Sequence, residues 1–254
     1  MELQTTLKNT RPKTNEWFGK WFDSPYYHIL YKHRDYEEAR AFMDRLVSYF
    51  QFSKNDLILD LACGKGRHAI FLNKKGYQVI GLDLSLKNIE QARKCENERL
   101  KFHVHDMRYR WPFHQFDYTL NLFTSFGYFE TPGENQQAIN AMSGNLKKGG
   151  KLLIDFLNPY TVINNLVPEE TKTINGIHFR INKYLDGEYI VKDIRFDDRE
   201  KHFHFQEKVK AIRRVRFLEY FKNANLNVID LFGDYDLNPY LAEKSERMIF
   251  VLQK

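Results

Sequence analysis

The chain has 254 residues, of which 43% are hydrophobic and 15% aromatic, so it can bury one sizeable core and is not expected to be disordered. Its net charge of +6 comes from 39 Lys and Arg scattered among 33 Asp and Glu, which disfavours a nucleic-acid partner, because such a partner needs a clustered basic footprint. No run approaches the roughly 18 consecutive apolar residues that span a bilayer, and the N-terminus lacks the apolar core of a signal peptide, so a soluble cytoplasmic protein without membrane association is predicted.

The first 50 residues are predicted to form an N-terminal helical segment. From Asp35 to Phe50 the apolar residues recur at the spacing of one helical face. The stretch before Asp35 is dense in aromatic residues, and about half of these are expected to belong to the core. The first domain boundary is therefore expected near residue 50.

Between residues 51 and 157, short apolar runs alternate with helical stretches, which is typical of βαβ units and a parallel sheet. The basic and glycine residues of Lys147–Gly150 are interpreted as the stop signal of the last helix in this part. The predicted strands are 56–62, 78–84, 100–106, 116–123 and 150–157, and the predicted helices are 65–75, 86–97 and 134–147.

The character of the chain changes after residue 157. Residues 158–212 alternate in hydrophobicity and carry turn dipeptides such as Asp186-Gly187, which predicts an inserted antiparallel β meander. A helix over 215–226 and two further strands then return to the core, which we expect to comprise residues 51–157 and 213–254. Because the insertion precedes the last elements of the core, it is predicted to act as a cap near the ends of the parallel strands.

The stretch LILDLACGKGRHAI is predicted to form a strand, a tight glycine turn and the start of a helix, the standard place for a ligand in a parallel sheet. It lacks the GxxxxGK[ST] pattern of a phosphate-binding P-loop and fits the GxGxxG pattern of dinucleotide sites poorly. Asp83, 23 residues after Asp60, can accept both hydroxyls of a ribose, and Asp106 and Asn121 end the next two strands. Four successive strand ends thus each offer a polar residue over one crevice.

Together these segments resemble the class I S-adenosylmethionine-dependent methyltransferases, in particular their small-molecule, type 11/25-like branch. LDLACGKGRHAIFL resembles the glycine-rich first motif of that family, VIGLDLS its acidic second motif, HDMR its adenine-side motif, and FDYTLNLFTSFGYF its motif at the active-site lip. The resemblance is close from Asp56 to Leu157 and departs from the family at Ala62, where a glycine is frequent. It implies a Rossmann-like, seven-stranded, mostly parallel sheet with helices on both faces. It also implies S-adenosyl-L-methionine as the methyl donor and S-adenosyl-L-homocysteine as its product.

The resemblance further implies a set of cofactor-binding residues. The residues implied to line the methionine and ribose are Asp60, Ala62 and Gly64, with Asp83 on the ribose hydroxyls. Those implied around the adenine are Leu84, Asp106 and Met107, and those implied to offer backbone near the amino group are Asn121 and Leu122. An arginine ahead of the first strand reaches the methionine carboxylate in several relatives, and Arg34 is the candidate in this chain.

Several of these residues also have a simpler structural interpretation. Asp60 could serve only as a cap of the following helix, and Asp83 could be part of a loop. Asp106 could be a turn carboxylate that pairs with Arg108. His68, in the first turn of the predicted helix 65–75, is expected to lie on the solvated surface.

Methyl transfer from a sulfonium is an in-line displacement, so aligning the acceptor and excluding water can supply most of the catalysis, and a base is optional. Four residues are candidates for such a base, with no preference among them: Tyr27, His28, Tyr128 and Tyr160. Aromatic residues of the N-terminal segment are candidates for a lid, because ring faces attract a sulfonium cation.

The favoured function is therefore methylation of a small-molecule acceptor, at nitrogen or oxygen, under the predicted cap. The alternatives are an RNA or protein methyltransferase and an S-adenosylmethionine-binding protein without turnover. The two cysteines, Cys63 and Cys95, are too few for a disulfide framework, and no pattern predicts a metal site or an oligomeric state.

Overall fold

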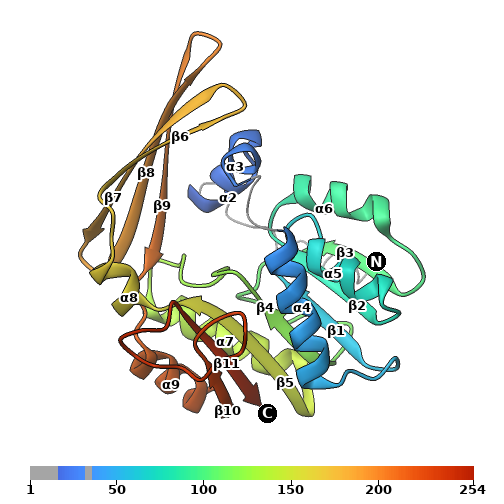
Figure 1. Cartoon of the computed structure of the whole chain (residues 1–254). Helices are drawn as coiled ribbons and strands as arrows, with labels where there is room; N and C mark the ends of the chain where they lie inside the picture. The colour runs from blue at the N-terminus through green and yellow to red at the C-terminus, as the bar shows by residue number, and fades with distance from the viewer. Residues whose placement is uncertain (1–16, 32–35) are drawn as a thin grey trace.

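The computed structural model describes residues 17–31 and 36–254, and for residues 36–38 the backbone alone. Its centre is a seven-stranded sheet with the strand order β10-β11-β5-β4-β1-β2-β3 (Figure 1). All neighbouring pairs are parallel except those of β11, which is antiparallel to both β5 and β10. The predicted seven-stranded, mostly parallel sheet is confirmed. Its strands are β1 (Leu57–Leu61), β2 (Gln78–Asp83), β3 (Leu100–Val104), β4 (Phe116–Asn121), β5 (Leu146–Leu157), β10 (Asn227–Phe232) and β11 (Arg247–Gln253).

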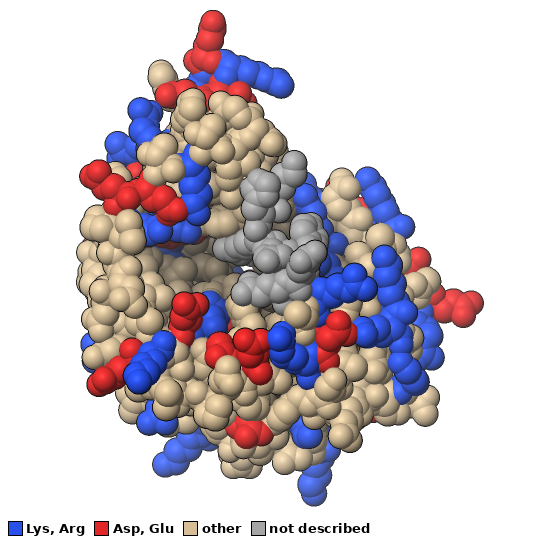
Figure 2. Space-filling view, in the orientation of Figure 1, with Lys and Arg blue, Asp and Glu red and all other residues tan. Residues whose placement is uncertain are grey.

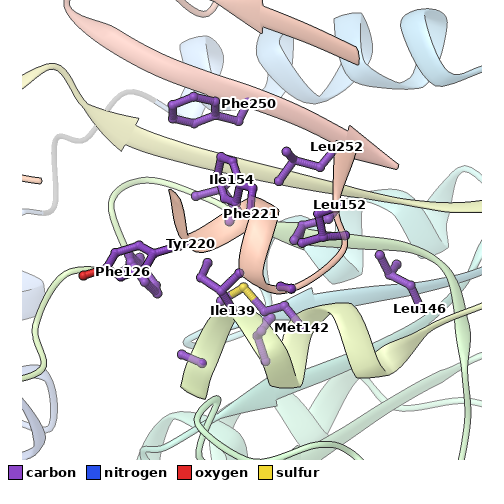
Figure 3. Packing of buried hydrophobic residues seen from close by; sticks show 14 of the residues in the cluster. Phe126, Ile139, Met142, Leu146, Leu152, Ile154, Tyr220, Phe221, Phe250 and Leu252 are labelled. Atoms are coloured by element: carbon purple, nitrogen blue, oxygen red, sulfur yellow. The ribbon is translucent and has the colours of Figure 1, made fainter. Parts of the chain in front are cut away.

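Helices pack on both faces of this sheet, as predicted, because alternate residues of each strand point to opposite sides. On β5, Leu152 and Ile154 pack in the same cluster as α7 and α9 (Figure 3), whereas Leu153 belongs to the cluster that contains α4, α5 and α6. The helices of the core are α4 (Tyr36–Phe50), α5 (Arg67–Lys74), α6 (Leu86–Ala92), which continues into the 3₁₀ helix η1 (Arg93–Cys95), α7 (Pro132–Asn145) and α9 (Arg214–Asn223).

The prediction that a helix continues to Lys147 is wrong. Helix α7 ends at Asn145, and β5 begins at Leu146, which is fully buried and pairs with Phe116 of β4. The Lys147 ammonium lies 2.8 Å from the carboxylate of Asp117 on β4. Burial of Leu146 and pairing with β4 therefore outweigh the helix-stop pattern, and basic residues that resemble the end of a helix belong to a strand.

A separate four-stranded antiparallel sheet, in the order β6-β7-β8-β9, follows the short helix α8 (Pro159–Asn164). The predicted meander is thereby confirmed. Two short helices near the N-terminus, α2 and α3, lie beside this sheet in Figure 1 and share a buried cluster with it, in which Trp21 and Leu30 join Phe179 and Phe196. The remaining elements are α2 (Trp17–Phe22), α3 (Pro25–Leu30), β6 (Glu169–Ile174), β7 (Ile177–Asp186), β8 (Tyr189–Asp198) and β9 (Lys201–Lys210).

The surface carries both signs of charge. Figure 2 shows Lys and Arg spread over one face and interspersed with Asp and Glu, and a hollow lies between the second sheet and the core. Every helix within residues 17–31 and 36–254 is too short or too polar to cross a membrane.

Candidate functional site

A cavity of about 390 Å³ opens at the C-terminal ends of β1 to β4, the edge at which parallel α/β sheets hold ligands. Part of its wall comes from the loops that follow these four strands. The rest comes from α2, α3 and Glu207 of β9 in the second sheet. The volume lies within the usual range of small-molecule sites, roughly 300–1,000 Å³. The structure thus brings the strand ends, the N-terminal aromatics and the second sheet around one space.

The loop after β1 turns in the left-handed region of backbone space. Ala62, Gly64 and Gly66 have φ values of +64°, +56° and +78°. A Cβ on Gly66 would lie 2.5 Å from the ring of Phe102, whereas the space around Gly64 is open. Gly66 is therefore required by packing, and Gly64 leaves room for a ligand to approach the backbone. Ala62 adopts a conformation that costs a non-glycine residue about 1–2 kcal/mol, so its departure from the family pattern carries a backbone cost.

Asp60, on β1, contacts the start of α5 and also borders the cavity. Its Oδ2 accepts a hydrogen bond of 3.1 Å from the backbone N–H of Ala69, in the first turn of α5, and the residue also lines the cavity. Only 2% of its surface is exposed. Burial raises the pKa of Asp60 to about 7, and the nearby Asp83 charge adds to the rise. Asp60 thus stabilises the first turn of α5 and has a raised pKa at the cavity wall.

Asp83, at the end of β2, is held at the cavity edge by backbone amides. The N–H of Gly64 donates to its Oδ2 and the N–H of Ser85 to its Oδ1, both at 2.8 Å. Burial raises the pKa of Asp83, and the two amide donors oppose that rise. The carboxylate therefore connects the glycine loop to the start of α6 and borders the cavity.

Asp106 forms an ion pair with Arg108, which was the simpler structural interpretation of this residue. Its two oxygens accept hydrogen bonds from the Arg108 guanidinium, the shortest at 2.6 Å, and both side chains are buried. Arg108 also donates to Glu134 of α7 at 2.9 Å. Asp106 nevertheless lines the cavity together with Met107. The pair fixes the loop after β3, and Asp106 also borders the cavity.

The side chains of Asn121 and its neighbour Leu122 lie in different surroundings. Asn121 is fully buried, and its amide donates to the carbonyl of Leu61 at 3.0 Å, so its side chain ties β4 to β1. Leu122 lines the cavity, as do Ala62, Gly64 and Leu84. Arg34 lies outside the described residues.

The four candidate bases lie in two different parts of the structure. Tyr27, His28 and Tyr128 line the cavity, whereas Tyr160 lies on α8, half exposed, and is not found among the described lining residues. The Tyr128 hydroxyl donates to the backbone carbonyl of Thr124 at 2.5 Å. Among the described residues, Tyr160 therefore lies outside the cavity wall to which the other three candidates contribute.

His28 lines the cavity close to the loop that carries Asp83. A side-chain hydrogen bond joins it to Asn88 of α6, which also bonds to Asp83. Burial, followed by the positive charge of Lys65, lowers the pKa of His28. The lowered pKa keeps the His28 imidazole neutral at the cavity wall.

The expectation that His68 is solvated is wrong. His68 is buried against the ring of Phe123, with ring centroids 5.0 Å apart and an interplanar angle of 2°. The loop after β4 folds back over the start of α5, and Phe123 has a left-handed φ of +56°. Burial lowers the pKa of His68 to about 3, and the adjacent Arg67 guanidinium contributes. A neutral His68 and a cationic Arg67 therefore border the cavity at the start of α5.

Sequence reasoning missed Glu207, which lines the cavity together with Tyr31, one of the N-terminal aromatic residues. Tyr31 follows α3, and its hydroxyl donates to the Glu207 carboxylate at 2.7 Å. Their elements are separated by most of the chain, so no local pattern could have linked them. The alternation of β9 is the only sequence signal that bears on Glu207, and it does not reveal what the strand faces.

Comparison with known proteins agrees with this geometry. The family model for a methyltransferase domain matches residues 58–150. A protein of Geobacillus sp. (strain WCH70) that carries a methyltransferase name is 25% identical over 95% of this chain and 100% of its own length. A crystal structure of an S-adenosylmethionine-dependent methyltransferase from Clostridium acetobutylicum superposes with a TM-score of 0.75 at 20% identity, covering 90% of this chain and 95% of the other. An S-adenosylmethionine-bound amino pentose methyltransferase from Micromonospora echinaspora superposes with a TM-score of 0.70 at 20% identity, covering 91% and 97%.

The chemistry of the cavity fits S-adenosylmethionine. Asp83 offers a fixed carboxylate for hydroxyl groups, and the open, left-handed Gly64 allows close approach to the backbone. Ring faces from Phe22, Tyr27 and Tyr128 suit a sulfonium cation. Residues 58–150 therefore match a methyltransferase domain, and the chain as a whole is similar to S-adenosylmethionine-dependent methyltransferases.

Proposed function

We propose that this enzyme methylates a small-molecule acceptor, at nitrogen or oxygen, inside the cavity. The observation that carries the proposal is the enclosure of the cavity by α2, α3 and β9 opposite the strand ends. A space of about 390 Å³ with walls on both sides admits a small molecule beside the cofactor more readily than a folded polymer. A structural relative that is an amino pentose methyltransferase supports the same substrate class.

The proposal assigns the strand ends to the cofactor. Asp83 binds the ribose hydroxyls, Leu84 with Asp106 and Met107 surrounds the adenine, and Asp60, Ala62, Gly64 and Leu122 line the ribose and methionine. Of Asn121 only the backbone remains available for this role, since its amide is used within the sheet. Arg34 stays a prediction for the methionine carboxylate.

S-adenosylmethionine supplies an electrophilic methyl group when bound. The residues of this chain contribute alignment and exclusion of water, which can provide most of the rate enhancement of an in-line displacement. The ring of Tyr128 lies 5.5 Å from that of Phe22, which in turn lies 5.0 Å from that of Tyr27. This aromatic wall keeps water from the methyl group and favours the positive charge of the sulfonium.

The domain division is part of the same proposal. The N-terminal segment (1–50) supplies a lid, residues 51–157 and 213–254 form the core, and residues 158–212 form the cap. The contribution of α2, α3 and Glu207 to the cavity wall supports this division. A cytoplasmic location remains a prediction.

Transfer of labelled methyl groups tests the proposal against its alternatives. Purified protein incubated with labelled S-adenosylmethionine and cell extract is expected to label the small-molecule fraction after separation by size. Label in RNA or protein that falls steeply with added salt would support a polymer substrate bound through the basic surface. Absence of label from every fraction, with cofactor binding intact, would indicate a binding protein without turnover.

The raised pKa of Asp60 gives a pH-dependent prediction. A sulfonium cation near Asp60 favours the ionised carboxylate, so S-adenosylmethionine is expected to gain affinity as the pH rises through the Asp60 pKa of about 7. The neutral thioether S-adenosylhomocysteine lacks this gain. Isothermal titration is expected to show their affinity ratio rising about tenfold between about pH 6 and about pH 8. In Asp60→Asn the affinity ratio of the two ligands is expected not to change with pH. An equal rise in that variant would show that Asp60 does not cause the pH dependence.

A further inference from the structure

Glu207 brings a carboxylate from the second sheet into the wall of the cavity. The strand ends that we assign to the cofactor lie on the core, whereas Glu207 belongs to β9, beside the N-terminal aromatics. Its side chain is 14% exposed. A carboxylate at such a place loses hydration, a cost that is recovered only when cationic or hydrogen-bonding partners surround it.

The Glu207 carboxylate is held by side chains from three elements. Trp21 Nε1 of α2 donates to Oε1 at 2.7 Å, and the Tyr31 hydroxyl donates to Oε1 and Oε2 at 2.7 and 2.8 Å. The Lys192 ammonium of β8 lies 3.3 Å from Oε2 and donates to the Tyr31 hydroxyl at 2.6 Å. These contacts fix both the position of the carboxylate and the direction of the Tyr31 proton.

The four side chains divide into two pairs by their place. Glu207 and Tyr31 border the cavity, whereas Trp21 and Lys192 do not belong to its described lining. Trp21 is 1% exposed and its ring lies 4.5 Å from that of Phe205, between α2 and the second sheet. Trp21 and Lys192 therefore orient the pair from behind, and Glu207 with Tyr31 faces the ligand space. An oriented carboxylate and phenol are what an ammonium group needs for recognition.

We propose that Glu207 and Tyr31 bind the methyl acceptor as an ammonium ion and take its proton, so that the acceptor of this enzyme is an amine. The inference rests on the proposed small-molecule function and deepens it. The acceptor R–NH₃⁺ gives one proton to the Glu207 carboxylate. The transfer is either direct or a relay, in which the Tyr31 oxygen takes the proton of the ammonium while the Tyr31 hydroxyl gives its own proton to Glu207. The products of this step are R–NH₂ and a neutral Glu207 carboxylic acid. The freed nitrogen lone pair then forms the N–CH₃ bond as the S–CH₃ bond breaks, giving R–NH₂CH₃⁺ and S-adenosylhomocysteine.

The first experiment identifies the atom that is methylated. Small molecules from cell extract are incubated with the enzyme and labelled S-adenosylmethionine, before and after treatment with an amine-selective acetylating reagent. Labelling is expected to disappear after acetylation, and mass spectrometry of the product is expected to show an N-methyl group. Label that survives acetylation, or an O-methyl product, would overturn the inference while leaving the proposed function in place. If the untreated small molecules take up no label, the proposed function itself fails.

The second experiment tests Glu207 with the labelled acceptor from the first. Glu207→Gln keeps an oxygen that can accept from Trp21 and Tyr31 but removes the base, so kcat/KM is expected to fall by about 100-fold or more. Affinity for S-adenosylmethionine and Tm are expected to change little, because the cofactor contacts lie on the core. The matched control is Glu188→Gln, an exposed carboxylate at the turn between β7 and β8 of the same sheet, which is expected to be neutral.

The pH profile separates a catalytic role from a structural one. In Glu207→Gln the amine must arrive already neutral, so kcat/KM is expected to rise with pH until the free amine has lost its proton, about tenfold per pH unit. In wild type, kcat/KM is expected to be independent of pH over part of this range, because Glu207 can take the proton. Parallel profiles for the two proteins would mean that Glu207 only anchors α2 and α3 to the second sheet, and would overturn the proposal.

Discussion

Replacing Asp83 by Ala is expected to weaken S-adenosylmethionine binding by at least about 100-fold. The Asp83 carboxylate is already oriented by the N–H groups of Gly64 and Ser85, so it can accept from two ribose hydroxyls without rearrangement. A hydrogen bond to a charged group contributes about 1.5–3 kcal/mol, and two of them exceed the roughly 2.7 kcal/mol that corresponds to a 100-fold change in affinity. Isothermal titration with the purified variant measures the loss. Glu90→Ala, which removes an exposed carboxylate from the same helix, α6, is the control and is expected to bind as wild type does.

A modified ligand shows whether the loss comes from the ribose. The 2′-deoxy form of S-adenosylhomocysteine is expected to bind wild type about tenfold or more weakly than the parent compound. In Asp83→Ala the two ligands are expected to bind alike, because the partner of the hydroxyl is gone. An equal penalty for the deoxy ligand in both proteins, or unaltered affinity in Asp83→Ala, would mean that the ribose lies elsewhere.

The strand ends could be predicted from the sequence because two simple rules combine there. Apolar runs of strand length mark the buried strands, and the carboxyl ends of parallel strands meet at one edge. Asp60, Asp83 and Asp106 follow directly from these rules, and all three line the cavity. The glycines of the first loop follow from the need for left-handed backbone, which the structure has at Gly64 and Gly66.

The direction of a side chain at a strand end is harder to predict. Successive residues of a strand point to opposite sides, so one position decides whether a side chain enters the cavity or the sheet. Asn121 donates to Leu61 within the sheet, whereas the next residue, Leu122, borders the cavity. The sequence pattern locates the end of β4 but not the residue that turns inward.

Contacts between distant parts of the chain cannot be predicted from local sequence patterns. His68 is buried because the loop after β4 covers it, and Glu207 is near Tyr31 because β9 packs beside α3. Each depends on how separate elements dock, which hydrophobic periodicity and turn residues do not encode. The site residues that sequence reasoning missed are therefore those contributed by tertiary packing.

Loss of Asp155 is expected to cost a large part of the stability of the fold. Asp155 is fully buried at the end of β5, and its carboxylate accepts from the backbone N–H of Phe123 at 2.7 Å and from Arg247 Nε at 2.8 Å. Removing one partner of a buried ion pair leaves an uncompensated charge, which costs about 3–5 kcal/mol. Asp155→Ala is therefore expected to lower Tm by about 10 °C, measured by calorimetry. Glu219→Ala, which breaks the exposed pair with Arg216, is expected to change stability by less than about 1 kcal/mol.

A double variant separates the stability of Asp155 from its effect on the site. Asp155→Leu with Arg247→Met replaces the buried pair by apolar side chains, which is expected to restore most of the lost stability. Phe123 and Thr124 have φ values of +56° and +57°, and the Asp155–Arg247 pair holds both residues, since Arg247 also donates to Thr124 Oγ1 at 2.8 Å. Without these contacts the strained turn is expected to relax and move Phe123 away from His68. The double variant is thus expected to remain folded yet bind S-adenosylmethionine about tenfold or more weakly, because a turn that is no longer held must be ordered again on binding. Wild-type affinity in a stable double variant would mean that other contacts fix this turn.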